Sequence, residues 1–182
     1  LDAYNISITG NNRKVDILYM NKQEILNGFL TITKEKYAAC QADAASVDKS
    51  HPTERGALQL KAGIYHAAIS AGLLSGTEQA IALMSKRFQN LIGQFPEIAD
   101  CYRTLPEDQK EIMAISLYPE VFMRVNFYDL YHTDLKQAEK DGDPQKIFKA
   151  RIKKEVLEDI LNLWRDFRVQ NELFVFAFDG KA

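Results

Sequence analysis

Hydrophobic residues recur every three or four positions along most of the chain, which is the spacing of one face of an α-helix. The first stripe runs from about residue 15 to residue 40 and predicts a long N-terminal helix. Its members are Val15, Leu18, Ile25, Phe29, Ile32 and Cys40. Residues 1–10 are poorly defined, and a hairpin over residues 4–20 stays open as an alternative because apolar residues there also alternate.

A polar segment separates this helix from the next. Residues 43–52 are small and polar and predict a loop, with Ser50 as the cap of a second helix. Within that helix, Gly63, Ala67 and Ala71 form a row of small residues at a spacing of four. Such a row predicts a close approach by another helix.

Capping patterns predict the starts of two more helices. The first pattern, S-G-T-E, begins at Ser75, and the second, T-L-P-E, begins at Thr104. Tyr118-Pro119 predicts a break, because a residue before proline avoids helical backbone angles. An aromatic helix is then expected to run to about Lys140.

The sequence D-G-D-P at residues 141–144 is the clearest boundary, since glycine ends one helix, aspartate caps the next, and proline fits its first turn. Helical spacing over residues 148–167 predicts a long final helix. The apolar tail, residues 172–182, is expected to dock on the bundle or to form an edge strand. These elements predict an all-α fold, with one domain over residues 1–182 built as a single bundle of about five to seven helices.

Composition narrows the class of protein. The chain has 182 residues, of which 46% are hydrophobic, and a domain of this length buries roughly 70% of its unfolded surface. No window approaches the ~18 consecutive apolar residues of a membrane-spanning helix. The net charge of -2 gives no overall attraction to nucleic acid or to an anionic membrane. Two cysteines are too few for a disulfide scaffold or a four-cysteine zinc site.

Sequence signatures of catalysis and metal binding are absent. The histidines, His51, His66 and His132, are not spaced as metal ligands on one helix face. Asp129 precedes His132 by three residues, which suits a hydrogen-bonded pair. The cysteines form no C-x-x-C motif, and the chain contains no G-x-S-x-G, P-loop or G-x-G-x-x-G sequence. We therefore expect no enzyme activity, no metal and no cofactor.

Five cations and no acid fall within nine residues at the start of the final helix. They are Lys146, Lys149, Arg151, Lys153 and Lys154, and we call them the basic patch. Cations at a helix N-terminus oppose the helix dipole, so a compensating partner is expected. The partner is either a set of acids of this chain, such as Glu107, Asp108 and Glu111, or an anionic molecule. A phospholipid headgroup and an acidic protein surface fit better than RNA, because aromatic residues are sparse there.

A candidate ligand pocket lies on the aromatic helix. Its residues are Tyr118, Phe122, Asn126, Tyr128 and His132. Aromatic walls with a few polar groups are typical of small-molecule pockets. Core packing is the alternative, because aromatic rings supply much of the buried area of a bundle.

Four short runs of sequence carry a resemblance to known proteins. They are Phe95-Pro96-Glu97, Tyr102-Arg103-Thr104-Leu105-Pro106, Asn126-Phe127-Tyr128 and Trp164. Over about half its length the chain resembles bacterial helical proteins of unknown function that follow an N-terminal membrane anchor. The resemblance implies a membrane-tethered bundle and brings no catalytic residue. Whether an anchor or signal precedes Leu1 stays open, and the cytoplasm or the cytoplasmic face of a membrane is favoured.

The leading functional hypothesis is a non-catalytic helical domain that binds a protein partner or a second copy of itself. A membrane tether is compatible with it. The alternative is a small-molecule sensor whose pocket lies within residues 118–132. The fold alone does not choose between them.

Overall fold

The computed structural model describes residues 20–72 and 77–176. All the regular secondary structure in this part of the chain is helical and none of it is strand, which confirms the all-α prediction. The elements are α1 (Lys22–Ser46), α2 (Pro52–Gly72), α3 (Glu78–Leu91), η1 (Ile92–Gln94), α4 (Pro96–Thr104), α5 (Glu107–Met123), η2 (Arg124–Tyr128), α6 (Asp129–Asp141) and α7 (Pro144–Gln170). The predicted helix start at residue 15 and the alternative hairpin lie almost wholly outside the described residues.

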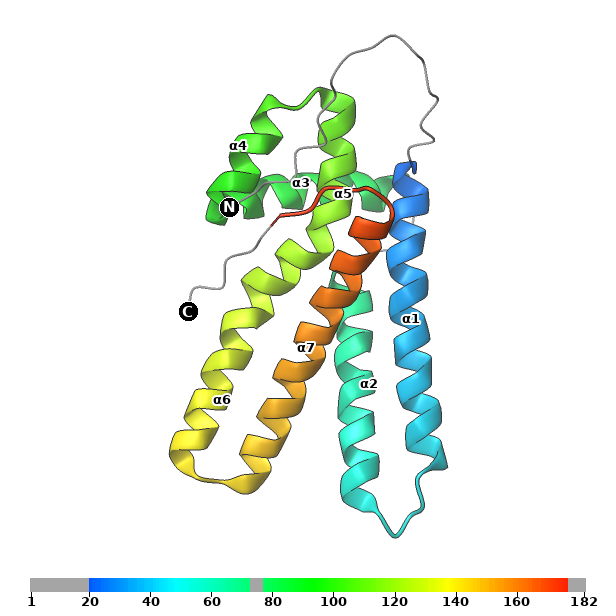
Figure 1. The fold of residues 1–182 in the computed structure, drawn as a ribbon, viewed down its shortest axis with the longest axis vertical. Coiled ribbons are helices and arrows are strands. Elements are labelled where there is room, and N and C mark those ends of the chain that lie inside the picture. The colour runs from blue at the N-terminus through cyan, green and yellow to red at the C-terminus, as the bar shows by residue number, and fades with distance from the viewer. Residues whose placement is uncertain (1–19, 73–76, 177–182) are drawn as a thin grey trace.

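Two helical hairpins and a group of helices at one end make up the bundle (Figure 1). The first hairpin is α1 with α2, and the second is α6 with α7. Helices α2 and α7 pack side by side and join the two hairpins. At the opposite end from the hairpin turns, α3 packs on α5, and α5 leads through η2 into α6.

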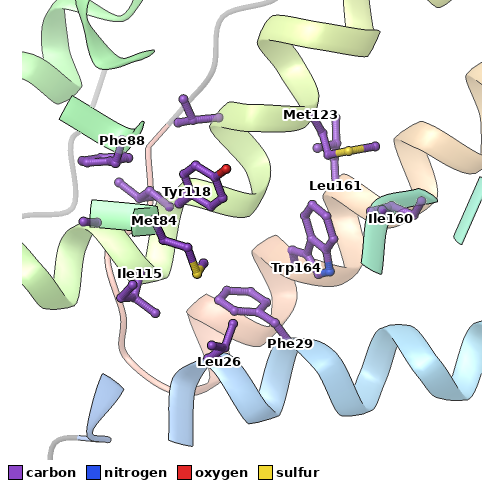
Figure 2. Close-up of a cluster of buried hydrophobic side chains, with 14 of the residues drawn as sticks. Leu26, Phe29, Met84, Phe88, Ile115, Tyr118, Met123, Ile160, Leu161 and Trp164 are labelled. Atoms are coloured by element: carbon purple, nitrogen blue, oxygen red, sulfur yellow. The ribbon is translucent and has the colours of Figure 1, made fainter. Parts of the chain in front are cut away.

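The core is centred on Trp164 of α7, which is fully buried against Phe29 of α1 (Figure 2). Their ring centroids are 6.2 Å apart and the rings are nearly perpendicular, which is a favoured aromatic geometry. The Trp164 Nε1–H donates to Thr33 Oγ1 at 2.9 Å, and the Thr33 hydroxyl donates to the Phe29 carbonyl at 2.6 Å. These hydrogen bonds leave the buried indole satisfied and fix the register of α1 against α7.

Side-chain caps start α1 and α3. The Asn21 side chain accepts a hydrogen bond from the Glu24 N–H at 2.9 Å, and the Glu24 carboxylate accepts from the Asn21 N–H. This reciprocal pair is a capping box. The cap of α3 is Thr77, whose hydroxyl accepts from the Ala80 N–H at 3.2 Å, two residues after the predicted cap at Ser75.

Two other predicted caps are wrong. The Thr104 hydroxyl donates to the Cys101 carbonyl at 2.8 Å and so closes α4, while α5 begins after a proline that has no capping group. Helix α2 begins at Pro52, which puts the cap position on His51 and not on Ser50. Proline occupies the first helical position of α2 and the cap position of α5, so in both places the hydroxyl lies too far back along the chain.

The predicted break at Tyr118-Pro119 is also wrong, because α5 runs through Pro119. A proline inside a helix costs about 3 kcal/mol through the lost hydrogen bond and the clash with the preceding turn. Every residue from 113 to 121 is buried, so the packing of α5 outweighs this cost. The chain then stays helical through the π-helix η2 into α6.

The close approach of two helices occurs at Gly28 and not at the predicted row in α2. A Cβ placed on Gly28 would lie 2.3 Å from Cζ of Phe167 in α7. Gly63 is exposed, and a Cβ there would meet nothing within 4 Å. The small-residue row therefore does not receive a helix at Gly63, while α1 and α7 meet at a glycine that the sequence analysis did not single out.

The C-terminal segment docks on the bundle as far as the structure describes it. Leu173, Phe174 and Phe176 are partly buried against the core. The Leu173 N–H donates to the Arg168 carbonyl at 2.9 Å, which turns the chain back at the end of α7. Residues 173–176 form no strand, so docking is the alternative that holds for them.

Candidate functional site

The basic patch lies at the outer end of the α6–α7 hairpin, where the turn residues behave as their sequence predicts. Gly142 ends α6 in the left-handed conformation with φ 69°. The Asp143 carboxylate caps α7 by accepting from the N–H groups of Gln145 and Lys146 at 2.9 and 3.3 Å. Pro144 occupies the first position of the helix. This carboxylate offsets part of the unfavourable interaction between the dipole and the patch.

Three of the five cations lie near acids of the hairpin itself. The nitrogen–oxygen distances are 3.7 Å for Lys146–Asp141, 3.6 Å for Arg151–Glu139 and 3.7 Å for Lys154–Glu158. All three exceed the length of a hydrogen bond. The acids that the sequence analysis offered as partners lie elsewhere, since Glu107 pairs with Lys110 and Glu111 pairs with Lys22.

The other two cations of the patch have no ion pair among the described residues. Lys149 is exposed, and the Lys153 ammonium lies 5.9 Å from the centroid of the Tyr131 ring. Phe148 beside them is 45% exposed, which is unusual for an aromatic residue of this bundle. The patch is therefore a solvent-facing cationic surface with one apolar side chain within it.

The five predicted pocket residues follow one another along α5, η2 and α6. Tyr118 is fully buried, Asn126 is exposed, and Phe122, Tyr128 and His132 are partly buried. The Asn126 amide donates to the Phe122 carbonyl at 2.9 Å, and His132 Nδ1 donates to the Tyr128 carbonyl at 2.8 Å. The polar groups of Asn126 and of His132 Nδ1 thus bond to their own helix. The structure brings the residues together as ring pairs, with centroid distances of 5.7 Å for Tyr118–Phe122 and 4.2 Å for Tyr128–His132.

The π-helix η2 is a feature that the sequence analysis missed. It holds Asn126 and Tyr128, and π-turns within helices often occur at functional sites. Arg124 is the first residue of η2, and its Cζ atom lies 5.3 Å from the centroid of the Tyr128 ring. The Tyr118 hydroxyl, one of the buried polar atoms, has no hydrogen-bond partner in the part of the chain that the structure describes.

A buried ion pair between Glu120 of α5 and Arg168 of α7 was also missed. Both side chains are almost fully buried, and Arg168 Nη2 donates to Glu120 Oε2. Glu120 accepts a second bond from Arg124 Nε at 3.0 Å. Burial lowers the pKa of Arg168, and the Glu120 carboxylate opposes that shift. One signal was present in the sequence, because Arg168 follows Ile160 and Trp164 at a spacing of four on the apolar stripe of α7.

Two shallow hollows open on the described surface. One, of about 450 Å³, lies between α1 and α2 and is lined by Tyr37, Gln41, Ala44, Ala45, Arg55, Gln59, Ala62, Gly63 and His66. The other, of about 410 Å³, is lined by Gln89, Ile92, Gly93, Ala99, Tyr102, Arg103, Glu107 and Lys110. Neither lining contains a residue of the basic patch or of the predicted pocket. The tyrosine hydroxyl of each hollow already accepts a hydrogen bond from a glutamine of the same lining.

The cysteines have the environment of structural thiols. Cys40 and Cys101 are free and partly buried. Burial raises the pKa of both thiols, although Lys61 opposes the shift at Cys40. A raised pKa keeps a thiol protonated at neutral pH, where it is a weak nucleophile.

Over residues 20–72 and 77–176, no group of three or more His, Cys, Asp or Glu side chains is arranged to hold a metal ion. No helix within the same residues is both long and apolar enough to cross a membrane. The chain matches no protein-family model, no curated protein and no solved structure.

Proposed function

We propose that the chain is a non-catalytic helical interaction domain that binds an acidic partner through the basic patch. One observation carries this proposal. None of the five patch cations donates a side-chain hydrogen bond within the described residues, whereas some cations elsewhere, although not most of them, do so. Lys110 reaches Glu107 at 2.7 Å, and Arg103 reaches Asp100 at 3.0 Å.

The ion pairs between patch cations and acids of the hairpin are weak enough for carboxylates of a partner to replace them. Exposed ion pairs contribute about 0–1 kcal/mol, so a partner carboxylate displaces a contact of 3.6 to 3.7 Å at little cost. Complementary charge also raises the rate of association. The exposed Phe148 ring adds apolar contact area. Aromatic side chains are enriched among the residues that contribute most of the binding energy at interfaces.

The proposal is tested with fluorescein-labelled polyglutamate and fluorescence anisotropy. We expect the wild-type protein to bind the probe, and to bind it less tightly as NaCl rises from about 50 to about 500 mM. Replacing all five patch cations by Gln should abolish binding. A control variant with the same change in net charge replaces Lys22, Lys86, Arg87, Arg103 and Lys110 by Gln. Absence of binding by the wild type, or equal loss in both variants, rejects the proposal.

A second candidate function is small-molecule binding near η2. The π-helix and the unpartnered Tyr118 hydroxyl favour it, because a buried polar atom without a partner loses solvation energy that a ligand can restore. A ligand that binds only the native state raises the melting temperature. A thermal-shift screen in which no compound stabilises the wild type more than a Tyr118→Phe variant rejects this function.

A further inference from the structure

The basic patch divides into two sides of α7. Arg151 reaches Glu139 of α6 at 3.6 Å, and Lys154 reaches Glu158, one turn further along α7 itself, at 3.7 Å. The remaining three cations, Lys146, Lys149 and Lys153, are separated by three and four residues, so they share one face of the helix. We call these three residues the lysine face.

The lysine face continues the core-facing stripe of α7. After Lys153 the same alternation of three and four residues leads to Val156 and Ile160, which are 2% and 0% exposed. In the first turns of α7 lysines therefore occupy this stripe, while the buried Ala150 and Ile152 flank it. In a longer bundle this stripe would contact another helix along its whole length.

The outer end of this stripe is exposed, although α6 contacts it at two points: Asp141 lies 3.7 Å from Lys146, and the Tyr131 ring lies 5.9 Å from the Lys153 ammonium. Lys149 is exposed, and the side chain of Lys146 is 63% exposed. Figure 1 shows α7 and α2 moving apart toward the hairpin turns. Lys149 and Lys153 have no carboxylate within 4 Å among residues 20–72 and 77–176, so two of the three charges lack an ion pair.

We infer that the lysine face docks an acidic amphipathic helix of a partner protein, an inference that rests on the proposed function above. The three lysines span about 10 Å along α7 at 1.5 Å per residue, which is two helical turns. Asp or Glu residues spaced by three and four on a partner helix have the same pitch, so each can meet one lysine. Such a helix would extend the bundle along the stripe where its own apolar core ends.

Charge at the hairpin tip favours a helix over an extended anionic surface. Asp141, Asp143 and Glu139 lie at or beside the turn, next to the start of α7. A membrane of anionic lipids or a nucleic acid that contacted the lysines would also meet these carboxylates. A single helix that lies along the lysine face covers a narrower surface and so meets fewer of these carboxylates.

The test uses two alanine-based peptides of equal composition and three protein variants. One peptide carries Glu at alternating spacings of three and four, and in the other the same residues are scrambled so that the acids share no face. We expect the wild type to bind the first peptide at least about tenfold more tightly, equivalent to about 1.4 kcal/mol. Lys149→Gln/Lys153→Gln should weaken this binding about tenfold or more. The charge-matched control, Arg151→Gln/Lys154→Gln, should retain it within about threefold.

Several outcomes overturn the inference while the proposed function survives. Equal affinity for the two peptides, or equal loss in the two double variants, shows that the patch binds acids without recognising a helix. Tighter binding to phosphatidylserine vesicles or to single-stranded RNA than to the first peptide identifies a different occupant. Failure to bind the peptides and polyglutamate rejects both proposals. Thermal denaturation followed by circular dichroism confirms that each variant is folded.

Discussion

Gly28 is the position where a single methyl group has the clearest consequence for packing. An added Cβ would lie 2.3 Å from Cζ and 2.5 Å from Cε2 of Phe167, and contacts under 3.0 Å force one of the groups to move. The Phe167 ring also packs on Phe29 at a centroid distance of 4.7 Å, so moving it disturbs a second contact. Gly63, inside α2, is the matched control because its Cβ would meet nothing within 4 Å.

The two Gly→Ala substitutions should shift stability in opposite directions. Alanine stabilises a helix interior by about 1 kcal/mol relative to glycine, and Gly63→Ala should gain about that amount. Gly28→Ala has the same gain but also an overpacking cost of about 1–3 kcal/mol, so we expect a net loss of about 1 kcal/mol. The gap of about 2 kcal/mol corresponds to about 4–8 °C in melting temperature for a chain of this size.

Urea denaturation followed by circular dichroism and by the fluorescence of Trp164, the one tryptophan, measures this gap. The Phe167→Leu substitution removes the outer ring atoms that clash with the new methyl group. A double-mutant cycle with Gly28→Ala should therefore show a favourable coupling of about 1 kcal/mol or more. Equal stabilisation by Gly28→Ala and Gly63→Ala, with no coupling to Phe167, would refute the close contact between α1 and α7.

Three further predictions concern buried polar groups. Glu120→Gln leaves the Arg168 guanidinium buried without its carboxylate and should cost about 3–5 kcal/mol in urea denaturation, most of it recovered when Arg168→Met is added. Thr33→Val leaves the Trp164 indole N–H without its acceptor and should cost about 1–3 kcal/mol, whereas Thr33→Ser keeps the hydroxyl and should cost less. Burial, with a smaller contribution from a nearby aspartate, raises the pKa of Tyr65 from 10.0 to about 12. The unfolded chain loses this proton first, so stability should fall between about pH 10 and pH 12, and Tyr65→Phe should remove that part of the fall.

Each of these predictions has an outcome that contradicts it. A loss below about 1 kcal/mol for Glu120→Gln would show that water reaches the Arg168 guanidinium. Equal stability of Thr33→Val and Thr33→Ser would mean that the indole finds another acceptor. Identical pH profiles for the wild type and Tyr65→Phe between about pH 10 and pH 12 would show that the phenol is not buried in the native state.

Features set by neighbouring residues were predictable from the sequence. Helical periodicity gave the all-α fold, because each helix must bury one stripe of its own surface. The boundary at residues 141–144 was predicted correctly, since the glycine, aspartate and proline act within one turn of each other. The position of the basic patch on the first turns of α7 was predicted for the same reason.

Features that depend on contacts distant in sequence were not predictable. Pro119 satisfies every local rule for a helix break, and only the burial of α5 on several sides keeps the helix intact. Gly28 and Gly63 both lie inside helices, and the position of α7 decides which of them is crowded. Glu120 and Arg168 are 48 residues apart, so nothing local pairs them.

Which cations of the basic patch pair with acids of the α6–α7 hairpin also depends partly on contacts between helices. Spacing alone places the lysine face on one side of α7, but the location of α6 decides which cations are held by the hairpin. Arg151 can be assigned to that role only once Glu139 of α6 is seen beside it, whereas Lys154 and Glu158 are four residues apart on α7. The candidate pocket residues were interpreted either as a ligand site or as core packing, and Asn126 and His132 bond to the carbonyls four residues before them. The π-helix that holds Asn126 matches no pattern in the sequence.

The uninterrupted passage from α5 through η2 into α6 has a mechanical consequence. The α6–α7 hairpin is attached to the rest of the protein by two continuous helical segments. One is α5–η2–α6 and the other is the 27-residue α7, and neither attachment contains a loop. Such a projection cannot swing freely, so the backbone positions of its charged residues are held at nearly constant separation before any encounter. The backbone entropy of assembling that surface has already been lost in folding, and a rigid counterpart then has only side chains to order.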